Sequence, residues 1–327
     1  MSELSNTFRS LNVVLVAEES AGLQSLRILA ASGHNIVAVM AQPSADPKSG
    51  ALWNHAQRLG YSTWPAKLVK QAGFADQLRE HQVDLLLNVH SLFVIHRDVL
   101  KACRIGAYNL HPGPLPERAG INVPSWSIYE GWDEHGVTLH EMVAEIDAGT
   151  IAYEARFPIT ATDSGMTLMS KCVRQGVPLI QQLLQDVGHG VDQVPKIEQE
   201  FSRRRYFDRS VPNEGWIDWH RPATEVVNFI RAADYAPFSS PWGAPQTQLG
   251  EQVIGIVKAS LIGLPCEAEP GTVGMPDRDG LLVAAEGEWV LVKTVELDGR
   301  RVPATAAFTT GARLIGLTMT DVSPMLV

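Results

Sequence analysis

Long hydrophobic runs and a surplus of positive charge are both missing from this 327-residue chain. No stretch approaches the roughly 18–20 apolar residues of a membrane-spanning helix, so we expect no membrane segment. The N-terminal residues MSELSNTFRSLN lack the basic start and apolar core of a secretory signal, which favours a cytoplasmic location. The net charge of -9 makes the surface a poor platform for nucleic acid, whose phosphates attract clustered Lys and Arg. We therefore expect no nucleic-acid partner.

Cysteine is scarce, and the usual cofactor motifs are absent. The three cysteines, Cys103, Cys172 and Cys266, are far apart and form no CxxC pair, so the sequence predicts neither a zinc site nor a disulfide framework. The turn after the first apolar run reads Glu18-Glu19-Ser20-Ala21-Gly22, which matches neither GxGxxG nor a P-loop. Two acidic side chains there would repel a phosphate. This turn gives no indication of a nicotinamide cofactor.

What the chain does have is enough apolar sequence for a large core: 45% of its residues are hydrophobic and 19% are charged. Its length exceeds that of one typical domain, so two domains are expected. In the first third, short apolar runs alternate with helical patterns, which predicts an α/β domain with a doubly wound, mostly parallel, Rossmann-like sheet. The expected strands are 12–17, 36–40, 83–89 and 106–110, and the expected helices are 22–31, 51–60 and 67–80.

The character of the sequence changes near residue 200. The run Arg203-Arg204-Arg205 is interpreted as a solvated linker, because charge runs commonly mark exposed connections. Residues 222–233 predict one amphipathic helix, and after Ser240 short apolar runs separated by Gly and Pro predict a small β-barrel or meander. We place the domain boundary so that residues 1–203 form a catalytic domain and residues 204–327 a smaller C-terminal domain.

Two polar motifs follow strands of the first domain. Asn109 and His111 end the predicted fourth strand, at the sheet edge where ligands bind in open α/β folds. Residues two apart on a strand share a face, so an amide that could stabilise an oxyanion lies beside an imidazole that could accept a proton. Farther on, Asp147-Ala148-Gly149 predicts a turn whose carboxylate could orient the imidazole. The residues alone also allow a purely structural role for all three.

Together the motifs resemble a known family. The stretch YNLHPGPLPERAG, followed by HGVTLHEMVAEIDAGTI, resembles the 10-formyltetrahydrofolate-dependent formyltransferases. The closest branch contains methionyl-tRNA formyltransferase, the aminoarabinose formyltransferase domain and the hydrolase domain of 10-formyltetrahydrofolate dehydrogenase. The resemblance implies that Asn109, His111 and Asp147 are catalytic. It also implies 10-formyltetrahydrofolate as formyl donor without a metal, and an OB-like C-terminal domain.

The resemblance further implies which segments hold the two substrates. The donor-binding residues would be Asn88, Val89, His90, Leu92 and Val94, together with Asp147. The loop beside the acceptor would contain Pro114, Leu115, Pro116, Arg118 and Gly120. This loop departs from the family pattern, because Arg118 and Ala119 stand where Tyr and Arg are usual. We therefore expect an unusual acceptor.

The resulting prediction is an N-formyltransferase that acts on the amine of a small metabolite, such as an amino sugar or an amino-acid-derived intermediate. A 10-formyltetrahydrofolate hydrolase and a methionyl-tRNA formyltransferase remain as alternatives, since the same three residues would serve them. A non-catalytic folate-binding relative is a third class. The C-terminal domain could hold the acceptor or form a homodimer contact. Trp126 and Tyr129, three residues apart, are interpreted as core packing on one helical face.

Overall fold

The protein was analysed as a computed structural model, which describes residues 8–46, 51–91 and 93–316. The chain divides into two compact units. The first comprises Met1–Gly120, Gly136–Phe157 and Ser170–Tyr206, and the second comprises Ile121–His135, Pro158–Met169 and Phe207–Val327. Each unit thus collects segments that are separate in the sequence. The predicted boundary between residues 203 and 204 stays a prediction.

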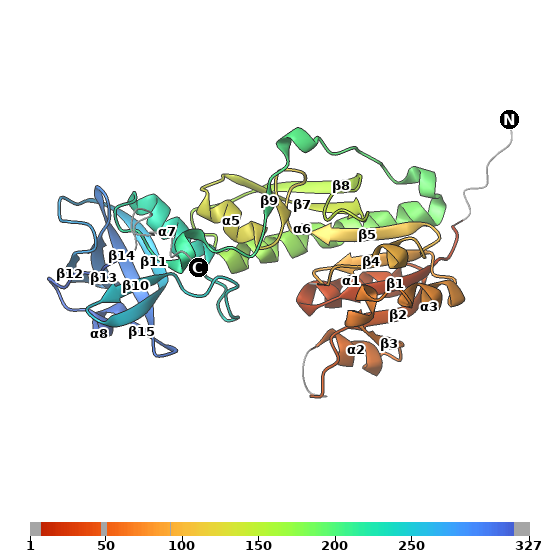
Figure 1. The fold of residues 1–327 in the computed structure, drawn as a ribbon, viewed down its shortest axis with the longest axis horizontal. Helices are drawn as coiled ribbons and strands as arrows, with labels where there is room; N and C mark the ends of the chain where they lie inside the picture. The colour runs from red at the N-terminus through yellow and green to blue at the C-terminus, as the bar shows by residue number, and fades with distance from the viewer. Residues whose placement is uncertain (1–7, 47–50, 92, 317–327) are drawn as a thin grey trace, which may run out of the picture. The chain divides into compact units, whose positions relative to one another are not determined.

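The first unit is built on a seven-stranded sheet with the order β3-β2-β1-β4-β5-β7-β8 (Figure 1). The strands from β3 to β5 pair in parallel, and β7 pairs antiparallel with β5. Apolar runs such as NVVLVA form the buried central strands, which are covered on both faces. This arrangement confirms the doubly wound, mostly parallel sheet. The strands are β1 Asn12–Ala17, β2 Asn35–Ala41, β3 Thr63–Pro65, β4 Leu85–Val89, β5 Gly106–His111, β7 Glu134–Glu141 and β8 Ile151–Pro158.

Helices connect these strands, and one of the expected helices differs in the structure. The expected helix 67–80 is instead a 3-10 turn η1 (Ala66–Lys70) and a separate helix α3 (Phe74–Glu80), interrupted at Gln71, whose backbone is extended. The long helix α6 (Gly165–His189) lies against the sheet, where a Cβ at Gly176 would meet Leu110 of β5 and Val137 of β7 (Figure 1). The other helices are α1 Glu19–Ala31, α2 Leu52–Arg58 and α4 Arg97–Leu100.

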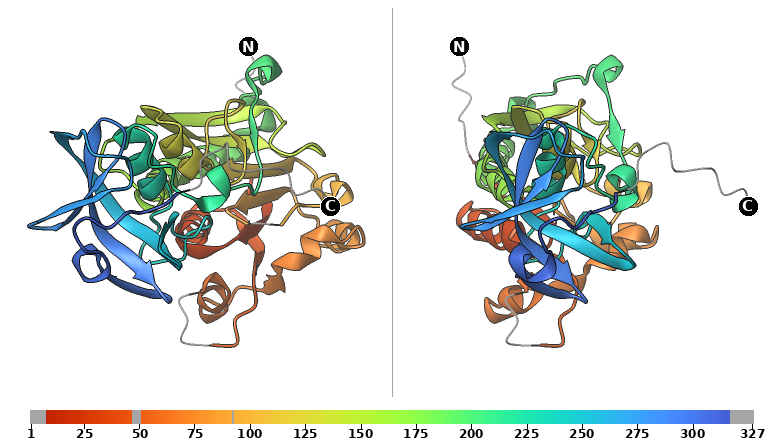
Figure 2. Two further views of the ribbon diagram at one scale, coloured as in Figure 1. Left: turned by 60° about the vertical axis from the view of Figure 1, so that its left-hand side comes forward. Right: turned by 90° about the vertical axis from the view of Figure 1, so that its left-hand side faces the viewer.

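The second unit contains an antiparallel sheet with the order β10-β11-β14-β13-β12, with β15 paired to β14. Residues near the end of the described chain bridge both edges of this sheet, at Gln248 with Ile315 and at Thr272 with Arg313. The strands, cyan to blue in Figure 2, therefore close into a small barrel, as expected. They are β10 Gln246–Leu249, β11 Gln252–Pro265, β12 Val273–Asp277, β13 Gly280–Ala284, β14 Glu288–Leu297 and β15 Arg300–Pro303.

An aromatic cluster packs inside the second unit. Trp126 of α5 (Val123–Tyr129) lies 5.0 Å from Trp242 and 5.3 Å from Phe207 between ring centroids. Tyr129 packs edge to face on Phe229 of α7 (Ala223–Ala232) at 5.4 Å. Such aromatic pairs stabilise a core beyond the area that they bury. Core packing of Trp126 and Tyr129 is thereby confirmed.

Short elements complete the description: α8 Ala304–Ala307, the 3-10 turns η2 Val191–Gln193, η3 Phe201–Arg203 and η4 Pro212–Gly215, and the two-stranded pair β6 Ala119–Gly120 with β9 Tyr206–Phe207. All three cysteines are buried free thiols. In the described part of the chain no helix is both long and apolar enough to cross a bilayer. The same residues hold no cluster of three or more His, Cys, Asp or Glu side chains suited to a metal ion.

Candidate active site

The ends of three neighbouring strands in the first unit bring polar side chains into one row. Asn88 of β4 pairs with Asn109 of β5, and Asn109 pairs with His140 of β7. The register therefore aligns two amides and an imidazole across the sheet. His140 was not assigned a role from the sequence, because its place beside Asn109 depends on the antiparallel register of β7.

Hydrogen bonds along this row fix the orientation of each side chain. Asn88 donates through Nδ2 to Oδ1 of Asn109 at 2.9 Å. The Nδ1 atom of His140 lies 2.8 Å from the carbonyl oxygen of Glu141, which only accepts, so this nitrogen carries a proton. In the neutral ring Nε2 then accepts from Nδ2 of Asn109, 3.2 Å away. One hydrogen of the Asn109 amide is thus held by His140.

His111 ends strand β5 and is almost completely buried, with 3% of its surface exposed. Its Nε2 atom lies 2.6 Å from the carbonyl oxygen of Arg118, so Nε2 is the protonated nitrogen. Its Nδ1 atom faces Oδ2 of Asp147 at 3.7 Å. Burial lowers the pKa of His111, and the attraction of Asp147 opposes this shift only in part. The ring is therefore neutral near pH 7, with the lone pair of Nδ1 directed toward the carboxylate.

Asp147 lies in the turn between β7 and β8, in a left-handed conformation with φ of 52°. Its Oδ2 atom accepts the backbone N–H of Gly120 at 2.8 Å, and its Oδ1 atom lies 3.5 Å from Nε2 of His140. Burial alone would raise the pKa of Asp147. The positive charge that His111 and His140 carry when they are protonated, together with the Gly120 N–H, outweighs burial and holds that pKa well below its usual range. The carboxylate is therefore ionised.

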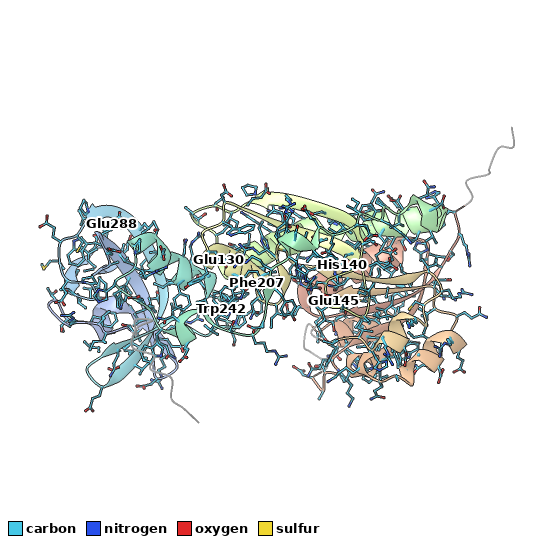
Figure 3. The ribbon with its side chains drawn as sticks, turned by 45° about the horizontal axis from the view of Figure 1, so that its top comes forward. Glu130, His140, Glu145, Phe207, Trp242 and Glu288 are labelled. Carbon is cyan, nitrogen blue, oxygen red and sulfur yellow. The ribbon has the colours of Figure 1, made fainter. Side chains whose placement is uncertain are left out.

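The turn that carries Asp147 is braced by the segment after α6. The Gln199 side chain donates to the carbonyl oxygens of Asp147 at 3.0 Å and Gly149 at 2.7 Å. Arg204 donates to the carbonyl oxygens of Ile146 at 2.7 Å and Asp147 at 3.0 Å. Its side chain is only 15% exposed, so the interpretation of the arginine run as a solvated linker is wrong for Arg204. His140 and Glu145, labelled in Figure 3, mark the strand end and the start of this turn.

The residues predicted to hold the donor lie at the end of β4 and beyond it. Asn88 and Val89 are buried in the strand, whereas Val94 is 64% exposed. His90 follows in a left-handed conformation, and burial, followed by the charge of His111, lowers its pKa to about 4. Its Nε2 atom is buried without a hydrogen-bond partner among the described residues. Leu92 lies outside the described residues.

The predicted acceptor loop turns most of its side chains into the first unit. Pro114, Leu115, Pro116 and Arg118 are all buried, and Arg118 has no exposed surface. The loop is tied to the sheet by the Leu115 N–H, which donates to the Thr138 hydroxyl at 3.1 Å. The loop therefore presents backbone groups to the site, as Gly120 does to Asp147. Acceptor contacts of this loop stay a prediction.

An amide donor, a neutral imidazole and an ionised carboxylate in this order suit acyl transfer, in which a proton must move and an oxyanion must be stabilised. The comparisons with known proteins agree with that chemistry. A family model described as formyl transferase matches residues 3–184, and a model described as formyl transferase, C-terminal domain, matches residues 209–313.

Solved structures share the fold. The N-formyltransferase from Helicobacter canadensis, in complex with folinic acid and dTDP-3-aminofucose, is 16% identical over 86% of this chain and 98% of its own, with a TM-score of 0.65. WlaRD, a sugar 3N-formyl transferase studied with dTDP and 5-N-formyl-THF, is 16% identical over 87% and 97%, with a TM-score of 0.64. HypX from Aquifex aeolicus with tetrahydrofolic acid is 17% identical over 91% of this chain and 47% of its own, with a TM-score of 0.63.

Proposed function

This chain belongs to the formyl transferase family, and on that premise we propose that it moves the formyl group of 10-formyltetrahydrofolate to the primary amine of a nucleotide-linked amino sugar. The observation that carries the proposal is the cluster of Asn109, His111 and Asp147 around one strand end. The acceptor class is supported by the sugar N-formyltransferases of the same fold, which are described with a dTDP-amino sugar and with dTDP. An amino-acid-derived amine stays an alternative acceptor.

Asn109 would stabilise the oxyanion. The acceptor amine attacks the formyl carbon, and the formyl oxygen takes up negative charge in the tetrahedral intermediate. His140 holds one hydrogen of the Asn109 amide, and the other hydrogen would donate to that oxygen. Asn88 holds the side-chain amide of Asn109 by donating to its oxygen, so the N–H group that would bind the oxyanion is oriented before the reaction begins.

His111 and Asp147 would move the proton. The neutral His111 accepts the amine proton at Nδ1, because its Nε2 already carries one toward the Arg118 carbonyl. The imidazolium then lies beside the ionised Asp147, which stabilises it. When the bond between the formyl carbon and N10 of the folate breaks, this proton passes to N10. The formyl group leaves the folate as an amide of the acceptor, and tetrahydrofolate is released.

The pterin ring of the folate donor would bind at the carboxyl end of β4. The buried Nε2 of His90 and Oδ1 of Asn88 lack a hydrogen-bond partner among the described residues. Polar ring edges of a pterin would satisfy such atoms, since buried polar groups cost free energy when left unpaired. The residues present therefore fit a folate donor.

Two other reactions would use the same residues. Water in place of the amine would make a hydrolase, and methionyl-tRNA would make a tRNA formyltransferase. The net charge of -9 argues against a tRNA acceptor, whose phosphates reward a basic surface. A hydrolase would need no amine acceptor, so a strict requirement of turnover for an amine would exclude that reaction.

The test is an absorbance assay of 10-formyltetrahydrofolate turnover with the full chain and a panel of amines. The panel contains nucleotide-linked amino sugars, amino acids and methionyl-tRNA, and the negative control is His111→Ala. The proposal predicts turnover only with an amino sugar nucleotide, abolished in the variant. Equal turnover without any amine would establish the hydrolase, and turnover with methionyl-tRNA alone would establish the tRNA enzyme.

A further inference from the structure

Arg204 is built into the turn that carries Asp147. Its two terminal nitrogens donate separately to the carbonyl oxygens of Ile146 and Asp147, at 2.7 and 3.0 Å. The planar fork of a guanidinium matches two neighbouring acceptors of this kind, whereas a lysine ammonium can present only a point charge. The backbone on both sides of the Asp147 Cα is therefore held by one residue that is far away in the sequence.

The guanidinium is itself fixed by aromatic rings. Its Cζ atom lies 5.6 Å from the ring centroid of Phe201 and 6.0 Å from that of Tyr206. A cation this close to an aromatic face is attracted by the ring and loses freedom to move. Phe201 and Tyr206 are 48% and 52% exposed, so burial in a core does not explain why they lie there.

The same segment contacts both sides of the site. The Gln199 side chain shares the Asp147 carbonyl with Arg204. The carbonyl oxygen of Arg205 accepts the Ala119 N–H at 3.0 Å, next to Gly120, whose own N–H donates to the Asp147 carboxylate. Residues 199–205 thus join the Asp147 turn to the loop that supplies its hydrogen-bond donor. We call this segment the brace.

The conformation of Asp147 shows why a brace is needed. Its φ of 52° is a left-handed value that an L side chain adopts only at a cost. The carbonyls of residues 146 and 147 would also be left without these donors if the brace were absent. Contacts that fix such a turn therefore decide where the carboxylate lies relative to His111.

We propose that Arg204 is a positioning residue of this active site, which holds the Asp147 carboxylate beside His111 and adds a fixed positive charge to their surroundings. The proposal rests on the proposed function, because it assigns Arg204 to the step in which His111 and Asp147 carry the proton. The site then includes a positioning residue that lies outside the strand ends.

The charges around His111 allow the proposal to be tested separately from folding. Asp147 faces the ring and favours its protonated form, whereas His140 and Arg204 oppose it. Loss of the Arg204 charge raises the pKa of His111, whereas displacement of the Asp147 carboxylate lowers it, so the two effects can be told apart by their direction. Since only the neutral ring accepts a proton, the acid limb of the rate profile follows that pKa.

The experiment compares the full chain with Arg204→Met, Arg204→Lys and the matched control Arg209→Gln, an exposed arginine outside the brace. We measure kcat against pH with an amino sugar nucleotide that supports turnover in the assay above, the melting temperature, and the His111 titration by NMR of the imidazole. Arg204→Met and Arg204→Lys should each lose on the order of 10²-fold in kcat, the effect typical of a misplaced group. In Arg204→Lys the NMR titration and the acid limb should both move to lower pH, because the ammonium keeps the charge but cannot hold both carbonyls. Arg204→Met should titrate at higher pH than Arg204→Lys, because it also lacks the charge.

A kcat for Arg204→Met within twofold of the control would overturn the proposal. So would a fall in the kcat of Arg204→Lys that follows the melting temperature while its His111 titration stays at the wild-type position. Should Arg204→Met fail to fold, Arg204→Lys decides alone: full activity would exclude the need for a bidentate fork. If the wild type shows no formyl transfer, the proposed function fails, yet the NMR titration still reports whether Arg204 acts on His111.

Discussion

At the scale of single residues, the site depends on which nitrogen of each imidazole carries the proton. The carbonyls of Arg118 and Glu141 each accept from one ring, which leaves Nδ1 of His111 facing Asp147 and Nε2 of His140 facing Asn109. Two histidines that look equivalent in the sequence thus have different tasks. His111 can take a proton, and His140 orients the amide.

Replacing Asn109 by Ala should lower kcat on the order of 10²–10³-fold, since one oxyanion donor is typically worth that much. The Michaelis constant for the folate should change far less, because the donor acts on charge that develops during the reaction. Steady-state kinetics of the variant measure both constants. Asn35→Ala, at an exposed position of β2, serves as the matched control and should match the wild type. A loss of less than tenfold in Asn109→Ala would contradict the assigned role.

The pH profile should show an acid limb below pH 6.5. The pKa of His111 is lowered by burial, so the neutral base persists to lower pH than an ordinary histidine, whose pKa is about 6.5. Activity is therefore present above the pKa of the folded protein and is lost as the pH falls through it. The measurement is kcat at saturating acceptor from pH 4.5 to 8, in which the ionisation of the free amine does not appear, with His111→Gln as the variant that should lack this limb. An acid limb above pH 6.5 would contradict a neutral, buried base.

Much of the site could be predicted from residues, and the part that could not has a physical reason. Asn109, His111 and Asp147 stand in motifs that are local in the sequence, and the resemblance to the formyltransferases assigned them catalytic roles that spacing alone had left open. His140 and Arg204 act through partners fixed by strand register and by the return of the chain after α6. No local pattern encodes either contact, and the arginine run even suggested a solvated linker.

At the scale of elements, the antiparallel strand β7 and the turn after it shape the site. The turn passes so close to β7 that a Cβ at Gly149 would lie 1.9 Å from the carbonyl oxygen of Glu141. Only glycine allows this approach, and the approach places Asp147 next to the end of β5. The carboxylate is thus positioned by backbone packing as well as by the brace.

Gly149→Ala should therefore destabilise the protein by about 1–3 kcal/mol, the usual cost of overpacking. It should also lower kcat more than stability alone explains, because the shifted turn carries Asp147. Thermal unfolding and kcat below the transition measure the two effects. Gly73→Ala, where an added Cβ meets no atom within 4 Å, is the control and should change neither. A wild-type kcat in Gly149→Ala would contradict this prediction, because it would show that catalysis does not depend on the position of the turn.

Elements with a continuous apolar run were the easiest to predict. The strand expected at 12–17 matches β1 at Asn12–Ala17, because a short continuous apolar run of this kind is typical of a buried strand. The expectation of one helix over 67–80 was wrong, since the extended backbone of Gln71 separates two short helical segments. The closure of the barrel depends on bridges from residues 313 and 315, which are distant from their partners in the sequence.

At the scale of the whole molecule, the net charge of -9 bears on the acceptor. A negatively charged protein repels an anionic sugar nucleotide at long range, and salt screens that repulsion at separations beyond about 10 Å at 0.1 M. We expect kcat/KM for such an acceptor to stay level or rise, by at most about threefold, between 20 and 200 mM salt. An uncharged amine gives the control. A steep fall with salt would indicate a basic groove for a polyanion.

The measurement that tests the central claim most directly follows the formyl carbon itself. The full chain is mixed with 10-formyltetrahydrofolate labelled with ¹³C in the formyl group and with an amino sugar nucleotide, and NMR records where the label goes. The account predicts a formamide signal of the acceptor that grows as the folate signal falls, and that is absent in His111→Ala. Label that appears as free formate at the same rate with and without the acceptor would contradict it.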